Sequence, residues 1–381
     1  MPCLWVARFF CVVGGVGVVF RFRALCYHAP PPAGGLDEYL SRLRLDDLRR
    51  VAGELSRRVE VWSVRVVAPV VEEAAGVFGV KPARFVEEFY EEAVRVAGYV
   101  AFPLGGLDAA LLVDLMESFE GAYFSVEYRE DRVGEIVRAL REVPERAGWV
   151  AGSRFAVSFG RPPVTPYFPV TRSGGEGLTA SLLYASHVRG EVSRGAALPE
   201  ALRGAALEAY RLAYEALDAS GSQVPLIGLD LSLSPWGEDS VAMLVEELLG
   251  MPLMSPGTLS LVRAINEALS ALAGSLKAVG FNEVMLPVAE DERLKELVRL
   301  GQLRFRDLVS LTPLCVAGLD MVLIPSTVDD RVLRGVMRDL YSLHLLKGRT
   351  MGMRVILVGA EPGEDVELGE FGKTPVMDPL Q

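Results

Sequence analysis

The sequence predicts an α/β fold in which a barrel-like sheet, closed or nearly closed, is surrounded by helices. Two observations predict it. Runs rich in β-branched residues alternate with apolar runs at helical spacing, and half of the 381 residues are hydrophobic while 23% are charged. The chain shows no internal repeat and no long linker. We therefore expect residues 36–381 to form a single α/β barrel-type domain, a size that one core of this type can fill.

The first half of this region alternates strands with helices. β-branched and aromatic residues predict strands at 59–67, 123–128 and 154–159. Apolar residues at helical spacing predict helices that begin at Pro82, after Tyr128 and at Pro199, the last of which stops at Gly221.

The second half continues the alternation. Strands are expected at 226–233, 281–286, 321–324 and 353–358, and helices at 239–249, 258–273 and 292–300. A further helix ends near Gly348. We expect Thr327 to cap its start, with Asp329 and Asp330 in the first turn, where acidic residues favour the helix dipole.

Residues 1–35 differ from the rest and are expected to lie outside the fold. The apolar run Phe9–Phe20 is shorter than the roughly 20 residues that cross a bilayer, and Gly14, Gly15 and Gly17 weaken it as a helix. We interpret the segment as a disordered extension or as residues upstream of the true translation start. An N-terminal membrane anchor is the alternative, and no other membrane association is expected.

The net charge and the amino-acid composition limit which partners and which cellular environment we expect. A net charge of −11 disfavours binding to nucleic acid. Cys3, Cys11 and Cys26 precede residue 36 and Cys315 stands alone, without zinc-site spacing or a disulfide framework, so we expect a cytoplasmic location. Only two Asn and three Gln occur, and 34 of the 39 basic residues are arginine. This usage suggests a thermophile, although GC-rich coding would also enrich arginine.

Four motifs follow one another in the C-terminal half: D-L-S-L-S-P at 230–235, L-P-V-A-E-D at 286–291, C-V-A-G-L-D-M at 315–321 and T-P-V-M at 374–377. With them the chain resembles the domain of unknown function 711 family, also called uncharacterised protein family 0210, over Val224–Met377 and more weakly from Val59. The resemblance implies a fold similar to the pyruvate formate-lyase-like glycyl radical enzymes, a homodimer and an ACT-domain partner protein. It implies no activity, and the chain departs from bacterial members at 171–177.

One further motif resembles the radical site of true glycyl radical enzymes. Residues 95–99 spell R-V-A-G-Y, the pattern around the radical-bearing glycine. In those enzymes the glycine lies near the C-terminus and works with a cysteine at the barrel centre. Gly98 is early, at the end of a predicted helix, where glycine commonly takes the left-handed conformation. We interpret Gly98 as a helix C-cap and expect no glycyl radical chemistry.

Acidic and hydroxyl residues gather beside the ends of predicted strands, which is where α/β folds bind ligands. The catalytic candidates are Asp230, Asp239, Glu290, Asp291 and Asp320, and Ser234 and Ser240 are candidates for orienting a ligand. Carboxylates in such a cluster suit Mg²⁺ or Ca²⁺. Helix capping is the alternative interpretation of the same residues.

The glycine-rich stretch 171–177 lacks the Lys-Ser/Thr pair of a phosphate-binding loop. Its amides can still form an anion nest, so we expect Arg172, Gly174 and Gly175 to bind substrate. A flexible surface loop is the alternative. Cys315 has no histidine near it in sequence and is expected to be a packing residue.

Two functions fit these patterns. The first is an enzyme that acts on a small polar anionic metabolite at one mouth of an α/β barrel, with or without a divalent cation. The second is a non-catalytic dimeric protein that has a metabolite-binding or regulatory role and an ACT-domain sensor as its partner. Repeated acids at strand ends favour the first function, and the missing nucleophile–base pair favours the second.

Overall fold

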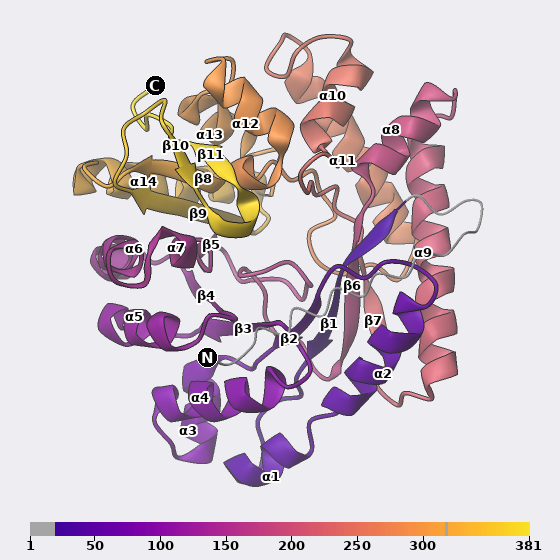
Figure 1. The fold of residues 1–381 in the computed structure, drawn as a ribbon, viewed down its shortest axis with the longest axis vertical. Helices are drawn as coiled ribbons and strands as arrows, with labels where there is room; N and C mark the ends of the chain where they lie inside the picture. The colour runs from indigo at the N-terminus through magenta and orange to yellow at the C-terminus, as the bar shows by residue number, and fades with distance from the viewer. Residues whose placement is uncertain (1–19, 317–318) are drawn as a thin grey trace.

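The computed structural model describes residues 20–316 and 319–381, and nine of its strands form one sheet in the order β7-β6-β1-β2-β3-β4-β5-β9-β8 (Figure 1). The strands are β1 Arg21–His28, β2 Val64–Val67, β3 Tyr99–Leu104, β4 Ala122–Glu127, β5 Phe155–Phe159, β6 Gly177–Leu183, β7 Leu226–Asp230, β8 Leu319–Pro325 and β9 Met351–Val358. A separate hairpin joins β10 (Asp365–Glu367) to β11 (Lys373–Pro375).

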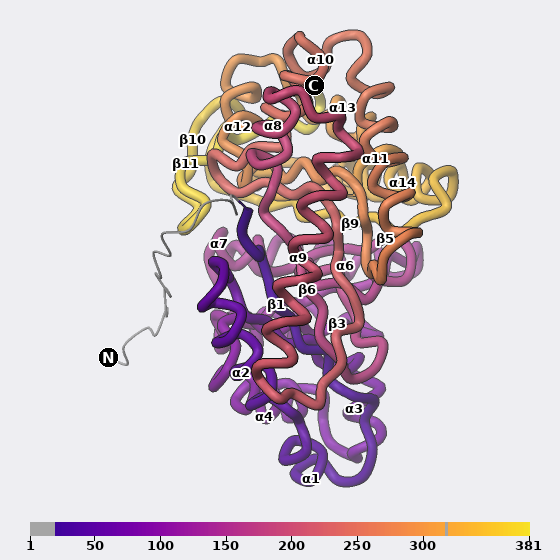
Figure 2. The backbone as a smooth tube through the Cα atoms, turned by 90° about the vertical axis from the view of Figure 1, so that its right-hand side faces the viewer, coloured from indigo at the N-terminus to yellow at the C-terminus, as the bar shows by residue number. Residues whose placement is uncertain are grey.

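Helices connect most of the strands. They are α1 Leu36–Ser41, α2 Leu45–Ser56, α3 Val71–Phe78, α4 Pro82–Ala93, α5 Ala109–Ser118, α6 Val133–Ala147, α7 Trp149–Gly152, α8 Ala185–Ser193, α9 Leu198–Ser220, α10 Val241–Leu249, α11 Thr258–Ser275, α12 Glu292–Arg299, α13 Phe305–Leu311 and α14 Asp330–Lys347. Three short 3₁₀ turns are η1 Glu130–Arg132, η2 Val288–Glu290 and η3 Gly369–Phe371. Figure 2 faces α9, which packs against α2, α8 and α11 on the outside of the sheet.

Strand direction divides the sheet into three blocks. Strands β1 to β5 are parallel, β6 and β7 run antiparallel to β1, and β9 with β8 runs antiparallel to β5. The start of β1 therefore lies beside the end of β6, as the pairing of Arg21 with Leu183 shows. The predicted α/β class is confirmed. The strand order has two ends, β7 and β8, so hydrogen bonding within the described residues does not show the predicted barrel closure.

The first strand corrects the expectation that residues 1–35 lie outside the fold. Strand β1 lies inside the sheet between β2 and β6, third from the β7 edge, and Phe22, Leu25 and Tyr27 are buried in the main core. Residues 20–35 therefore belong to the domain. Residues 1–19, with most of the run Phe9–Phe20, lie outside the described residues. No helix in the part of the chain that the structure describes has the length and apolarity needed to cross a bilayer.

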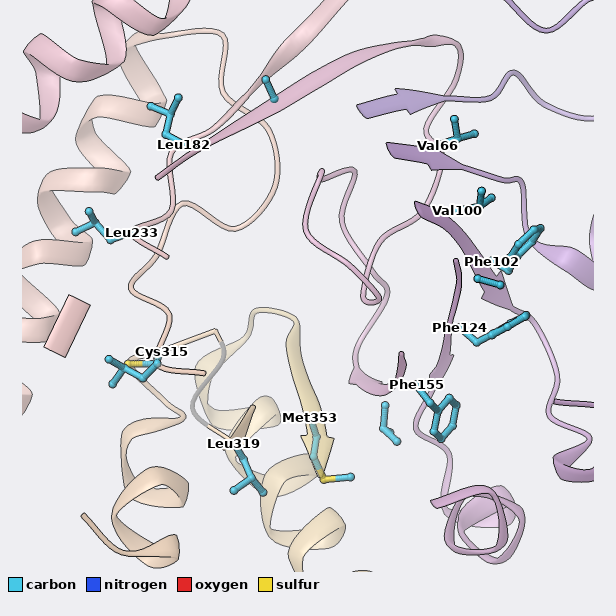
Figure 3. Close-up of a cluster of buried hydrophobic side chains, with 14 of the residues drawn as sticks. Val66, Val100, Phe102, Phe124, Phe155, Leu182, Leu233, Cys315, Leu319 and Met353 are labelled. Carbon is cyan, nitrogen blue, oxygen red and sulfur yellow. The ribbon is translucent and has the colours of Figure 1, made fainter. Parts of the chain in front are cut away.

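The outer face of the sheet carries the main hydrophobic core. Val66, Val100, Phe124 and Phe155 come from neighbouring strands and point to the same side (Figure 3). Apolar faces of the surrounding helices cover them; Phe89 of α4, for example, packs edge-on against Phe102. This burial follows from the alternation of side chains along each strand, which sends every second residue outward.

The inner face of the sheet is covered differently. The loop 160–176, between β5 and β6, lies against it, and its Phe168 packs on Cys26, Val67 and Ala101 of three adjacent strands. The same face carries charged and phenolic side chains, among them Arg65 and Tyr99. The inner face is therefore the polar side of the sheet.

Several predicted elements need correction. The segment 281–286 is irregular and contributes an isolated bridge between Val284 and Leu233, although a strand was expected there. Helix α4 already ends at Ala93, and Gly98 is not left-handed; its amide donates to the carbonyl of Val64 at 3.1 Å as the chain enters β3. Helix α9 does end as predicted, with Gly221 left-handed at φ 62°.

The start of α14 also differs from the prediction. The carboxylate of Asp329 accepts the amide of Arg331 at 2.7 Å, so Asp329 is the cap in place of Thr327. The predicted strands at 123–128, 154–159 and 353–358 are confirmed within two residues.

Candidate functional site

A small pocket of about 70 Å³ opens on the inner face of the sheet, where β1 to β4 begin and the chain leaves β7. Aromatic side chains form much of its wall: Trp62, Tyr99, Tyr123, Tyr167, Phe168, Trp236, Phe281 and Phe371. Its charged side chains are Arg23, Arg65, Arg354, Glu290, Asp320 and Glu370. A concave site with an apolar wall and a few charged groups is the usual form of a small-molecule site.

The arginines reach the pocket because of their places in strands. Arg65 lies between Val64 and Val66, which face the outer core, so its side chain faces inward. Arg23 lies where the pairing of β1 with β6 shifts register between Phe22 and Ala24. Such irregularities re-aim a side chain, and here the side chain turns to the inner face.

A buried ion-pair network joins two of the arginines to two carboxylates. Glu290 accepts from Arg23 at 2.6 Å and from Arg354 at 2.9 Å. Arg354 also donates to both oxygens of Asp320, at 2.5 and 2.7 Å. The paired, planar geometry is that of a strong guanidinium–carboxylate contact. These two arginines are therefore compensated inside the protein.

The pKa values of these carboxyl groups follow from burial and from their partners. Burial by itself would raise the pKa of Glu290, but Arg23 and Arg354 together hold it below its ordinary value. For Asp320, burial outweighs Arg354, and the nearby Glu290 adds to the rise, so its pKa is raised. Asp320 therefore holds its negative charge mainly through Arg354.

Arg65 is different because no carboxylate in the described part of the chain pairs with it. Its Nε donates to Ser63 Oγ at 2.9 Å and its Nη1 to the carbonyl of Pro166 at 3.0 Å, while Nη2 makes no hydrogen bond within the described residues. Only 7% of Arg65 is exposed. Burial, and then the neighbouring Arg23, lower the pKa of its guanidinium.

Phenol and indole groups surround this guanidinium. Its carbon lies 5.2 Å from the ring centroid of Phe168, 5.7 Å from Tyr99 and 6.0 Å from Trp62. Such distances allow cation–π attraction, which partly replaces water around a buried charge. The hydroxyls of Tyr99 and Tyr123 make no hydrogen bond to described residues, and burial raises the pKa of both, so they remain donors.

The mouth of the pocket is formed by the turn η3. Lys295, whose side chain is buried, donates to the carbonyl of Phe371 at 2.6 Å and so fixes this turn. Phe371 packs edge-on against Trp236, with ring centroids 5.5 Å apart. Glu370 is an exposed residue, yet the protein around its carboxyl group raises its pKa, against the attraction of Arg65.

Of the residues predicted from the sequence, the structure brings Glu290, Asp320 and Ser234 to this pocket. Ser234 accepts the hydroxyl of Tyr167 at 2.9 Å. Asp230 lies behind the pocket wall, fully buried, and accepts Thr165 Oγ1 at 2.6 Å together with backbone amides. It therefore anchors the loop that supplies Tyr167, in the role that capping and turn residues usually have.

Gly280 packs directly against the carboxylate of Asp230. A Cβ atom built at Gly280 would lie 1.9 Å from Oδ2 of Asp230, and the residue has φ +79°. Only glycine fits the close approach and the left-handed backbone together.

Asp291 and Ser240 lie away from the pocket and join two helix starts. Asp291 accepts Ser240 Oγ at 2.7 Å, the first amides of α10 at 3.0 and 3.1 Å, and the first amides of α12 at 3.0 and 3.3 Å. Burial nevertheless raises the pKa of Asp291 to about 6. Ser240 in turn caps α10 by accepting the amide of Met243. Asp291 and Ser240 are therefore helix caps, which was the alternative interpretation of these residues from the sequence.

The remaining candidates also lie outside the pocket lining. Asp239 accepts the amide of Ser186 at 2.6 Å, and Arg172 donates to the carbonyl of Pro162 at 2.8 Å. Gly174 packs beside Val164, and Gly175 has a positive φ in the same loop. The structure thus does not bring these four residues to the cavity.

A divalent cation does not fit the carboxylates as they stand. Within residues 20–316 and 319–381 no group of three or more His, Cys, Asp or Glu side chains is placed to hold a metal ion. Glu290 and Asp320 already accept from arginines, and Asp230 and Asp291 from amides and hydroxyls.

Sequence reasoning missed the three arginines, although each leaves a signal. Arg65 and Arg354 each stand singly inside an otherwise apolar strand, which indicates a buried charge, and Arg23 lies in a largely apolar strand that also holds Arg21 and His28. The interpretation of Cys315 as a packing residue agrees with the structure. Cys315 is fully buried, and burial raises the pKa of its thiol to about 12.

Residues 129–369 match the family model described as Uncharacterised ACR (DUF711). Similar curated proteins are UPF0210 proteins of Clostridium acetobutylicum (31% identical over 160 residues, 40% of this chain and 36% of the relative), Carboxydothermus hydrogenoformans (31% over 169 residues, 43% and 37%) and Methanocorpusculum labreanum (28% over 169 residues, 43% and 37%). The match spans little more than a third of the length of these relatives.

Proposed function

The chain belongs to the uncharacterised DUF711 family, and we propose that it binds a small anionic molecule in the pocket on the inner face of its sheet. The observation that carries this proposal is Arg65, a buried guanidinium that, among the described residues, has no carboxylate partner and keeps Nη2 free at the pocket. Burying an unpaired charge is costly, and an anion bound to it would recover part of that cost.

The comparison with a second buried arginine supports this role. Arg154 also lacks a carboxylate partner in the part of the chain that the structure describes, but its Nη1 donates to the carbonyls of Phe119 and Ala122 and its Nη2 to that of Met116. Both terminal nitrogens of Arg154 are thus used within the fold. Arg65 keeps one for a ligand.

The other groups of the pocket would hold the ligand in place. The hydroxyls of Tyr99 and Tyr123 offer further donors beside Arg65, and the network of Glu290 with its two arginines fixes the floor without competing for the ligand. Catalysis would need a proton carrier, and Glu370 suits that task because its pKa is raised and its carboxyl makes no hydrogen bond to described residues.

Thermal denaturation with a panel of anions tests the proposal. Acetate, phosphate, succinate, phenylacetate and phenyl phosphate are added to wild-type protein and to Arg65→Gln and Arg172→Gln variants. We expect at least one anion to raise the melting temperature of the wild type by about 3 °C at a hundredfold excess over Kd, from a stabilisation of about 2.7 kcal/mol. Arg65→Gln should abolish the rise and Arg172→Gln should retain it.

Stabilisation by no anion, or stabilisation that persists in Arg65→Gln, would contradict the proposal. Disappearance of the stabilising anion on incubation, followed by chromatography, would identify an enzyme; its persistence would identify the metabolite-binding alternative. The proposal also includes four expectations from the sequence: a closed sheet, likeness to the glycyl radical enzyme fold, a homodimer and an ACT-domain partner. Light scattering tests the homodimer.

A further inference from the structure

We infer that the ligand is a monocarboxylate carried on an aromatic or similarly flat apolar group. This inference rests on the proposed function and specifies its substrate class. Two features of the pocket carry it: the balance of charge in its buried part and the aromatic composition of its wall.

The buried part of the pocket has one positive charge in excess. Arg23, Arg65 and Arg354 face it, and the carboxylates of Glu290 and Asp320 compensate two of these charges. Glu370 lies at the exposed mouth, and its negative charge therefore stands outside this buried part. A single carboxylate would therefore make the buried part neutral.

A doubly charged ligand would instead bring one negative charge more than this buried part can neutralise. A phosphate monoester carries almost two negative charges at neutral pH. One would pair with Arg65, and the second would find no free cation in the described lining, because Arg23 and Arg354 are already paired with Glu290 and Asp320. Placing that uncompensated charge in the pocket is unfavourable. The ion pairs of Glu290 and Asp320 therefore disfavour a dianionic ligand, and they also hold Arg23 and Arg354 in place.

Hydrogen bonding around Arg65 agrees with a small anionic group. Because Nε and Nη1 are already used, Arg65 offers the ligand only Nη2, with the hydroxyls of Tyr99 and Tyr123 as nearby neutral donors. These neutral donors can complete the contacts of a carboxylate without adding charge.

The wall of the pocket specifies the rest of the ligand. Eight of its 23 lining residues are aromatic, whereas aromatic residues make up 8% of the chain. Trp62 and Trp236 lie with ring centroids 4.2 Å apart, and Phe371 continues this surface at 5.5 Å from Trp236. Aromatic surfaces of this kind favour flat rings, which stack or pack edge-on against them. A free small acid such as acetate would leave this surface unused.

Isothermal titration calorimetry with four probes tests the inference on the wild-type protein. Phenylacetate supplies both features, phenylacetamide removes the charge, phenyl phosphate doubles it, and acetate removes the ring. We expect phenylacetate to bind at least about tenfold more tightly than each of the other three. Arg65→Gln should weaken phenylacetate by about tenfold or more, with partial recovery in Arg65→Lys, and Arg172→Gln should bind as the wild type does.

The outcomes separate this inference from the proposed function. Tighter binding of phenyl phosphate, or equal binding of acetate, overturns the inference and leaves the anion site in place. Equal binding of phenylacetamide, or phenylacetate affinity unchanged in Arg65→Gln, overturns both. Failure of every anion to bind also overturns both. The wild-type series alone decides the class of ligand, so the result stands even if an Arg65 variant does not fold.

Discussion

Replacing Asp291 with alanine should destabilise the fold without acting through the pocket. Asp291 is fully buried, and its two oxygens accept one hydroxyl and four backbone amides at the starts of α10 and α12. Alanine removes the acceptor for both helix starts at once. The residue therefore works as a double cap that holds two consecutive helices at a fixed distance.

The magnitude follows from these contacts. Two lost caps cost about 1 kcal/mol each. Buried donors left without an acceptor add about 1–3 kcal/mol. We expect Asp291→Ala to lower the free energy of unfolding by about 3–5 kcal/mol, in the severe range for a single substitution. For a chain of 381 residues this corresponds to about 4–6 °C in melting temperature.

Equilibrium unfolding in urea at neutral pH, followed by circular dichroism, measures this loss. Asp239→Ala is the matched control, because Asp239 is only partly buried and accepts the single amide of Ser186. It should cost about 1 kcal/mol. If Asp291→Ala unfolds like the wild type, or if it abolishes ligand binding while stability is unchanged, the capping role is refuted and Asp291 belongs to the binding site.

Three further predictions follow from the pocket and the core. Glu290→Gln should lower the free energy of unfolding by about 3–5 kcal/mol, because it leaves Arg23 and Arg354 without their shared carboxylate; Glu370→Gln at the exposed mouth should leave urea unfolding unchanged. Because the pKa of Glu370 is raised, this carboxyl group gains its proton, as pH falls, at a higher pH than an ordinary glutamic acid, and over that interval its repulsion of a bound carboxylate ends. Phenylacetate affinity should therefore rise over that interval while the probe stays ionised, and calorimetry on Glu370→Gln should show no such rise. Cys315 should resist iodoacetamide in the native protein and react after unfolding, as peptide mass spectrometry would show; labelling in the native state would contradict its burial and raised pKa.

Local patterns predicted much of the fold because they depend on neighbouring residues. The run 353–358 is a strand by its β-branched content, and α9 ends at Gly221 because glycine readily adopts the left-handed conformation. The segment 281–286 shows where this reasoning fails. It has the composition of a strand, but the carboxylate of Asp230 takes the amides of Phe281 and Asn282, so no ladder forms there.

The residues of the candidate site also divide into those that the sequence indicated and those whose role only the structure shows. Ser234, Glu290 and Asp320 were found because polar residues at strand ends are visible in the sequence. Glu290 and Asp291 are adjacent, yet one carboxylate binds arginines in the pocket and the other caps helices. Sequence neighbours cannot be assigned to opposite sides of a chain until the backbone direction at that turn is known.

The sequence by itself determined the α/β class, the outward-facing apolar residues and the residue types available for binding an anion, because these depend on composition and on the period of side chains along strands and helices. The tertiary structure decided which charges remain unpaired. Arg23 and Arg354 come from strands at distant parts of the chain and are neutralised by Glu290 and Asp320, whereas Arg65, in the strand beside Arg23, meets no carboxylate among the described residues. Pairing between charges depends on distances between segments that are remote in sequence, and those distances are set only when the sheet is assembled.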